Sequence, residues 1–167
     1  MEVMKEEMPP NMPEPRGRPL HHTIFVDADH AGNVVRQHSQ TGIAQFLNSA
    51  PIDWYSKKQN TVEGSTFGSE FNALRTAVDR GVALRYKLRM FGIPIDGPID
   101  IYCDNEGVDK NASIPESRLQ KKHNSVCYHR VREAAAAEIC RVAREDGKTN
   151  PADLMTKTTQ SSCDKRR

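Results

Sequence analysis

The first regular pattern of hydrophobic and polar residues along the chain is a set of three short β-favouring runs. They occupy residues 23–27, 41–47 and 51–57, and turn-forming residues at 48–50 separate the second run from the third. Because each run is short and the last connection is tight, the pattern predicts three strands in an antiparallel meander. A polar loop, residues 58–65, follows them.

A helical pattern comes next. Apolar residues from Phe67 to Leu88 recur mostly at intervals of three or four, as on one face of a long helix. Ser65 or Thr66 can cap its start, because a side-chain oxygen there can accept a backbone N–H of the first turn. Gly92 and a following proline end it.

The second half alternates strands and helices. A compact strand is expected at 99–104, a helix at 124–138 and a short strand at 139–143. Asn150 is expected to cap a final helix, with Pro151 at its first position. The whole order predicts an α/β protein.

Length and composition favour one domain with extensions. A chain of 167 residues with 37% apolar residues can build one core, but two full domains would be cramped. Five of the ten prolines lie in the first twenty residues, which lack an apolar period. We therefore expect a disordered linker over 1–20, a domain over 21–158 and a disordered tail over 159–167. The linker is typical of a connection from a preceding segment, although Met1 is equally a genuine start.

Charge and cysteines exclude some classes of protein. The net charge is only +2, so contacts to a polyanion would have to be local. Residues 111–132 carry five basic side chains against one acidic one, which makes them a candidate phosphate-facing surface. The four cysteines lack metal-ligand spacing. No apolar stretch predicts a membrane span or a secretory signal, so an intracellular location is expected, with the compartment open.

Four acidic residues stand where a predicted strand ends or a helix begins: Asp27, Glu70, Asp104 and Asp153. Carboxylates at such positions can converge on one edge of a mixed sheet and hold divalent cations for phosphodiester chemistry. The chain has 22 Asp and Glu, so spacing alone proves nothing. Glu70 is also explained as a residue that complements the helix dipole, and Asp104 as part of an Asp–Asn turn.

Several sequence blocks resemble one family. The chain resembles the ribonuclease H domain at the C-terminal end of copia-type retrotransposon Pol polyproteins. The matching blocks, in order over roughly residues 23–157, are Val-Asp-Ala-Asp-His-Ala-Gly (26–32), Ser-Gln-Thr-Gly (39–42), Trp-Tyr-Ser-Lys-Lys-Gln-Asn-Thr-Val-Glu (54–63), Ser-Thr-Phe-Gly-Ser-Glu-Phe-Asn-Ala-Leu (65–74), Tyr-Cys-Asp-Asn-Glu (102–106), Lys-Lys-His-Asn-Ser-Val-Cys-Tyr-His (121–129) and Pro-Ala-Asp-Leu-Met-Thr-Lys (151–157).

The resemblance implies a ribonuclease H-like fold, with a mixed five-stranded sheet of three antiparallel strands followed by two parallel ones, flanked by helices. It implies hydrolysis of the RNA strand of RNA–DNA hybrids. The four acids would be both the catalytic residues and the ligands of two Mg²⁺ ions, for which Mn²⁺ can substitute. Asp27 matches the family's first acid better than Asp29 does. An upstream reverse transcriptase is the expected partner domain, joined through residues 1–20.

Substrate contacts are expected from residues in or beside the matching blocks: Thr66, Asn105, Lys121, Lys122 and His123. For the last three, a solvated cluster at a helix entry is the alternative. The stretch 145–150 lacks the loop histidine that many ribonucleases H carry before the last acid. Another group would have to serve in product release or proton transfer. His123 and His129 are candidates, but a surface or helix-packing role is the favoured alternative for both.

Two other functions stay open at this point. One is a catalytically silent nucleic-acid-binding or interaction domain that keeps the fold. The other keeps the catalysis but changes the substrate, because integrases, resolvases and exonucleases place acids similarly on the same sheet. Retention of all four acids argues against the first, and the block matches favour ribonuclease H over the second.

Overall fold

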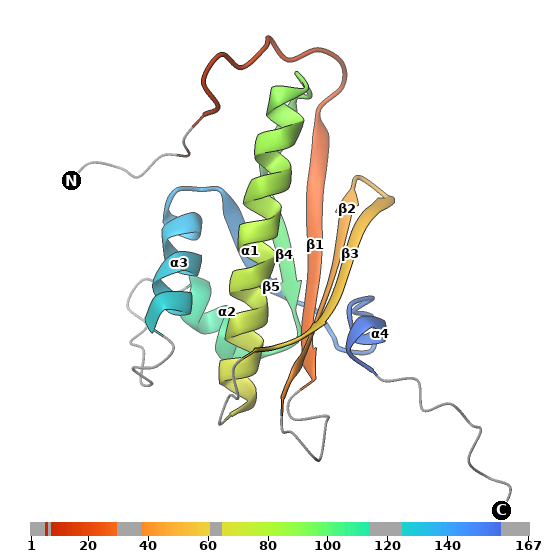
Figure 1. Ribbon diagram of the computed structural model, residues 1–167, viewed down its shortest axis with the longest axis vertical. Coiled ribbons are helices and arrows are strands. Elements are labelled where there is room, and N and C mark those ends of the chain that lie inside the picture. Colours follow the sequence, from red (N-terminus) through yellow and green to blue (C-terminus); the bar gives the residue numbers. More distant parts are fainter. Residues whose placement is uncertain (1–5, 7, 30–37, 61–64, 114–124, 158–167) are drawn as a thin grey trace, which may run out of the picture.

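Five strands form one mixed sheet in the computed structural model, which describes residues 6, 8–29, 38–60, 65–113 and 125–157. The strands are β1 (Leu20–Asp29), β2 (Gln40–Leu47), β3 (Ala50–Lys58), β4 (Ile95–Cys103) and β5 (Cys140–Arg144), in the order β3-β2-β1-β4-β5 (Figure 1). The first three pair antiparallel, and β4 runs parallel to both β1 and β5. The predicted mixed five-stranded sheet is confirmed.

Four helices are described: α1 (Thr66–Met90), α2 (Glu106–Ser113), α3 (Ser125–Ala136) and α4 (Asp153–Thr156). The long helix α1 packs along β1, β2 and β4, and α3 packs on α1. In Figure 1, α4 lies apart from the other helices, beside β2 and β3. The sheet therefore has a thick helical cover on one face and a single short helix on the other.

The core lies between α1 and the sheet. Side chains alternate between the faces of a strand, and Ile24 and Val26 are both buried on the α1 side of β1. Phe71 and Leu74 of α1 are fully buried against them. A Cβ at Gly81 would lie 2.8 Å from Ile24 Cδ1, so the helix can approach the sheet this closely only with glycine there. The odd-numbered neighbours in β1, including Asp27, lie on the opposite face.

Local signals at the ends of α1 behave as predicted. Ser65 is the N-cap, and its hydroxyl accepts the backbone N–H of Gly68. At the other end, Gly92 has φ +69°, and its N–H donates to the carbonyl of Arg89. Because both ends are fixed, the turn that carries Glu70 has a defined position over the sheet.

The structure corrects two predicted boundaries and adds one helix. Strand β1 does not end at Asp27 but pairs with β2 as far as Asp29. The final helix begins at Asp153, and Asn150 instead closes a turn by accepting the N–H of Ala152. Helix α2 was not predicted, because Val108 and Ala112 are its only buried residues among those described, and two positions give no clear period.

The described part of the predicted linker contacts the domain. The carboxylate of Glu6 accepts hydrogen bonds from Arg85 Nε and Arg89 Nη2, both at 2.8 Å. Arg85 is buried, and its Nη1 also donates to the carbonyl of Gly97 at 2.7 Å. Further along, the N–H of Arg16 donates to the carbonyl of Gly92. The domain boundaries and the disorder of the extensions stay predictions.

Helix α4 is seated directly on β2 at Gly42. A Cβ at this position would lie 2.6 Å from the carbonyl oxygen of Ala152 and 2.8 Å from Thr156 Cγ2. The Ser56 hydroxyl of β3 donates to the carbonyl of Met155 at 2.6 Å. Asn150 Nδ2 donates to the carbonyl of Val26 at 3.0 Å. The last helix is therefore held against three strands.

We expect Gly42→Ala to destabilise the protein by about 1–3 kcal/mol, because the added methyl group overlaps backbone atoms that cannot rotate away. The midpoint of urea unfolding measures this. Gly107→Ala in α2 is the matched control, since its Cβ would meet only side-chain atoms, at 3.2 Å or more. Equal midpoints for Gly42→Ala and wild type would show that α4 is not held as described.

No described helix combines the length and apolar character that a bilayer crossing requires. The cysteines of the described part of the chain, Cys103, Cys127 and Cys140, form no disulfide.

Candidate metal centre

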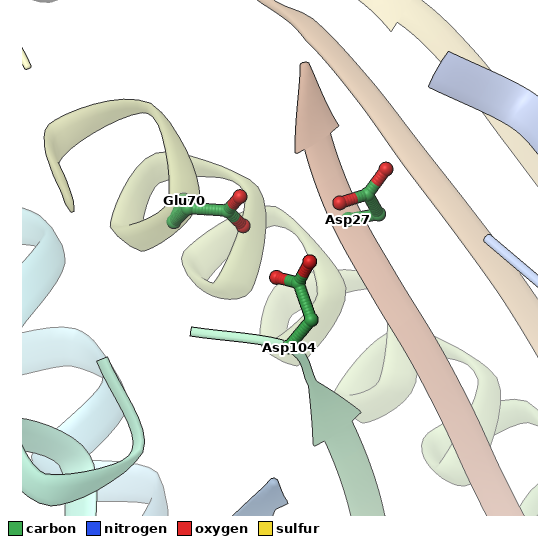
Figure 2. A group of neighbouring side chains, drawn as sticks. All are labelled: Asp27, Glu70 and Asp104. Atoms are coloured by element: carbon green, nitrogen blue, oxygen red, sulfur yellow. The ribbon is translucent and has the colours of Figure 1, made fainter. Parts of the chain in front are cut away.

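Three of the four predicted acids converge. Asp27 lies in β1, Glu70 in the second turn of α1, and Asp104 directly after β4. Each offers one carboxylate oxygen such that the three atoms lie within 4.8 Å of one another. Figure 2 shows the three side chains pointing toward a common point from these separate elements. Oxygen ligands grouped in this way are what Mg²⁺ and Ca²⁺ bind in proteins.

The strand pairing explains why the two aspartates meet. Strands β1 and β4 are parallel, and their last paired residues are Phe25 and Tyr102. Asp27 and Asp104 each lie two residues beyond this pair, at the same end of neighbouring strands. Beyond that point β1 continues beside β2 while β4 ends, so the two strands separate. The carboxyl ends of parallel strands at such a separation are a frequent ligand site in α/β folds.

Glu70 closes the centre from the helical layer. Its side chain is buried, with 5% exposure, and its Oε2 has no hydrogen-bond partner among the described residues. A buried charged oxygen without a partner is costly. A cation would supply the missing partner, so this orphaned atom fits a metal site better than it fits a purely structural glutamate.

The pKa of Glu70 reflects the same burial. Burial, and then the charges of Asp104 and Asp27, raise the pKa of this side chain to about 9. Burial also raises the pKa of Asp104, to which the charge of Asp153 adds. Without a cation, Glu70 would thus be protonated at neutral pH, and a divalent ion would relieve the repulsion among the carboxylates.

Asp27 has the same environment with one difference. Burial raises its pKa, and the hydrogen bond from the Thr156 hydroxyl opposes this rise. Thr156 Oγ1 donates to Asp27 Oδ2 at 2.5 Å. The charges of Asp104 and Asp153 raise the pKa further. The backbone N–H of Ala28 also lowers the pKa, so Asp27 is a carboxylate held by protein donors inside a group of like charges.

Asp153 lies outside the group of three. It is the first residue of α4, as its predicted place at a helix start requires, but its Oδ2 pairs with the Nζ of Lys157 four residues later. Its charge nevertheless acts on both aspartates of the centre. The structure thus brings three acids together and leaves the fourth beside them in an ion pair.

The predicted substrate contacts have different placements. Thr66 is exposed at the start of α1. Asn105, next to Asp104, uses its Oδ1 to accept the N–H groups of Gly107 and Val108, so it caps α2. Lys121, Lys122 and His123 lie outside the described residues. Of the predicted substrate contacts, the structure therefore describes one exposed residue, Thr66, and one residue that caps a helix, Asn105.

In the described part of the basic segment 111–132, the two arginines form hydrogen bonds within the protein. Arg130 Nε donates to Asp79 of α1 at 2.8 Å, and Arg132 Nη1 donates to the Tyr128 hydroxyl at 2.6 Å. His129 is exposed on α3, and its ring lies edge-on to that of Tyr128. These contacts join α1 to α3 and shape the α3 surface. A role of this segment in binding phosphates stays a prediction.

Sequence reasoning missed Thr156. It lies three residues after Asp153, so the two share one face of a helical turn. The spacing could have indicated Thr156, because a residue three positions after Asp153 on a helix lies on the same side and can reach the same neighbouring groups. Its bond to Asp27, 129 residues earlier, follows only from the folded arrangement.

Comparison with known proteins agrees with the geometry. No protein-family model matches the chain. In sequence, it is 30% identical over 142 residues to the retrovirus-related Pol polyprotein from transposon RE2 of Arabidopsis thaliana, a match that covers 85% of this chain. The same match covers 10% of that polyprotein, so the chain spans about a tenth of its relative's length.

Solved structures share the fold. The N-terminal RNase H domain of a Mycobacterium tuberculosis protein superposes with a TM-score of 0.64 at 13% identity, over 82% of this chain and 91% of that one. A foamy viral protease-reverse transcriptase in complex with an RNA/DNA hybrid superposes with a TM-score of 0.51 at 15% identity, over 90% of this chain and 21% of that one. These likenesses establish the fold.

Proposed function

Since this chain is homologous to a segment of transposon Pol polyproteins and has the ribonuclease H fold, we propose that it hydrolyses the RNA strand of RNA–DNA hybrids with divalent cations. The observation that carries the proposal is the group of three carboxylates within 4.8 Å, one of them the buried Glu70 with an oxygen that lacks a partner among the described residues. The copia type of the parent element is part of the proposal.

The cation that we propose is Mg²⁺, with Mn²⁺ as a substitute. Bound as a pair of ions, it would activate the attacking water and stabilise the charge that develops on the leaving 3′ oxygen. Asp27, Glu70 and Asp104 would hold it, with Asp153 as the fourth ligand once Lys157 releases that carboxylate. Asp29, exposed to intermediate degree at the end of β1, is not needed for this set.

The chain's own residues do the positioning. The parallel pairing of β1 with β4 fixes Asp27 and Asp104, and the Ser65 cap fixes the turn of α1 that carries Glu70. Because Asp27 and Glu70 come from a strand and a long helix and Asp104 directly follows a strand, little ordering is left to do when a cation binds. A rigid ligand set of this kind is suited to holding a phosphodiester at one attack angle.

The proposed substrate is the hybrid rather than a DNA duplex. A ribonuclease H needs no base sequence, and contacts to RNA 2′-hydroxyls across a shallow groove can distinguish the strands. We propose Thr66 and Asn105 for such contacts and Lys121, Lys122 and His123 for the phosphates. The foamy viral structure, a protease-reverse transcriptase with a bound hybrid, supports both this substrate and a reverse transcriptase as the partner domain.

A cleavage assay on three substrates tests the proposal. Labelled RNA–DNA hybrid, RNA duplex and DNA duplex of one sequence are incubated with the protein in Mg²⁺. We expect the RNA strand of the hybrid to be cut, and the two duplexes to be cut at least about tenfold more slowly. Equal cutting of all three would overturn the proposal. Salt-sensitive binding of the hybrid without cutting would instead favour a catalytically silent nucleic-acid-binding domain.

A further inference from the structure

We propose that Thr156 is a positioning residue that fixes the carboxylate of Asp27 for cation binding. This inference rests on the proposed function, and it assigns a role to a residue that is not a ligand. Thr156 is 2% exposed, and its Oγ1 donates to Asp27 Oδ2 at 2.5 Å. The bond holds one oxygen of a carboxylate that belongs to the group of three.

The hydroxyl has a choice of acceptors, and the geometry favours the carboxylate. Thr156 Oγ1 also lies 3.1 Å from the carbonyl oxygen of Asp153, the ordinary acceptor one turn earlier. A hydroxyl carries a single proton, and hydrogen bonds to an ionised oxygen are shorter and stronger than those to a neutral one. The proton therefore goes to Asp27, and the carbonyl of Asp153 is the second, weaker contact.

The backbone that carries Thr156 is held on several sides. Ser56 donates to the carbonyl of the preceding residue, Met155, and Asn150 ties the start of the turn to the carbonyl of Val26. Val26 is the neighbour of Asp27 in β1. Both ends of this segment therefore bond to the same part of β1. Asn150 bonds to the backbone carbonyl of Val26, and Thr156 bonds to the carboxylate of Asp27.

Gly42 in β2 allows α4 to lie close to the sheet at this point. It pairs with Asp27 in the sheet, and the space that its missing side chain leaves admits Thr156 Cγ2 and the backbone of Ala152. Any larger residue at 42 would hold the Thr156 hydroxyl away from β1. The close approach of α4 to the sheet therefore brings the Thr156 hydroxyl within hydrogen-bond distance of Asp27 Oδ2.

Such partners of metal ligands commonly matter for metal affinity. Groups that orient a ligand raise its effective affinity, and their loss typically costs about 10–100-fold. Thr156 also links the residue that opens α4, Asp153, to the first strand. It is the only described side chain outside the acids that the structure bonds to a carboxylate of the group of three.

Two substitutions at one position test the role. Thr156→Val keeps the shape and removes the hydroxyl, whereas Thr156→Ser keeps the hydroxyl and removes the methyl group. We expect Thr156→Val to weaken Mg²⁺ binding, measured by calorimetry on the full chain, by about tenfold or more, and Thr156→Ser to stay within about twofold of wild type. In hybrid cleavage, Thr156→Val should lower kcat with little change in KM.

Thr41→Val is the matched control. Thr41 is equally buried in the neighbouring strand, and its hydroxyl accepts from Gln59 rather than contacting a carboxylate. Far-ultraviolet circular dichroism and the urea midpoint verify that each variant folds. We expect Thr41→Val to bind Mg²⁺ as wild type does.

Three outcomes would overturn the inference. A folded Thr156→Val with wild-type Mg²⁺ affinity would remove it, and so would equal losses in Thr156→Val and Thr156→Ser, which would indicate packing. The proposed function would survive both results, because wild type would still bind Mg²⁺ and cut hybrid. A wild-type chain that binds no Mg²⁺ would overturn the proposed function and this inference together, whereas one that binds Mg²⁺ without cutting would leave the Thr156 test intact.

Discussion

Asp104→Asn is expected to lower the rate of hybrid cleavage by roughly 10²–10³-fold or more, because it removes a charge from the point where the three carboxylates meet. The amide has the same shape, but its nitrogen cannot bind a cation and its oxygen carries no full charge. Since Asp104 follows the last residue of β4 and is half-buried, the substitution leaves the sheet pairing intact. Initial rates at saturating Mg²⁺ measure the effect.

Asp96→Asn supplies the control for this result. Asp96 lies in the same strand, exposed, near its opposite end. The chemical change is identical, so a general effect of charge on hybrid binding would act on both variants. We expect Asp96→Asn to cut at the wild-type rate. Cleavage by Asp104→Asn at that rate would show that the group of carboxylates is not the catalytic centre.

Glu70→Gln is expected to make the cation-free protein more stable at alkaline pH than wild type. In the unfolded chain this carboxyl has its ordinary pKa near 4.5, whereas burial and the neighbouring aspartates raise the folded value to about 9. Between these values the folded state holds a proton that the unfolded state releases. The contribution of Glu70 to stability is therefore complete below pH 4.5 and is lost as pH rises toward 9, by at most about 1.4 kcal/mol per pH unit. Glutamine has no proton to lose.

The measurement is urea unfolding in EDTA between pH 7 and 8.5. This window avoids the titration of His22, whose pKa burial lowers to about 4, and whose effect on stability has the opposite sign below pH 6.5. Wild type should lose stability across the window, and Glu70→Gln should lose clearly less. Parallel curves for the two proteins would mean that Glu70 is ionised without a cation, contrary to its environment.

Added Mg²⁺ distinguishes the two proteins a second time. A ligand that binds only the folded state stabilises it in proportion to the logarithm of its concentration above Kd. At pH 8 wild type should therefore regain in Mg²⁺ the stability that it lost in EDTA. Glu70→Gln should gain little, because one of the ligand oxygens has been replaced. A full response of the variant would place the cation away from Glu70.

The places of Asp104 and Glu70 relative to their own strand and helix can be predicted, because each is defined locally. Asp104 follows a run of β-favouring residues, and Glu70 follows a capping serine at the spacing of a helical second turn. The meeting of Asp27 and Asp104 follows from one rule, that neighbouring parallel strands end at the same edge, whereas Glu70 reaches them from α1. The mixed five-stranded sheet was expected from the resemblance to the ribonuclease H family, because the order of the elements alone predicts only an α/β protein.

Two side-chain contacts near the end of the described chain were not predicted. Nothing near Asp153 shows that Lys157 takes its carboxylate, since an acid and a lysine four residues apart are common on any helix. Asn150 has the residue type of a helix cap, yet its amide is used to hold the carbonyl of Val26. The first contact is local, whereas the second joins residues 124 positions apart and follows only from the folded arrangement.

The alternation of side chains in β1 has a consequence for the folding of the protein. A slip of one residue in the pairing of this strand would put Val26 or Ala28 where Asp27 belongs and would turn the carboxylate into the apolar layer under α1. Such a misassembled chain would lose its hydrophobic packing and its affinity for cations in the same event. Cation capture can therefore serve as a quality check on refolded material, since it reports the correct alignment of the central strand.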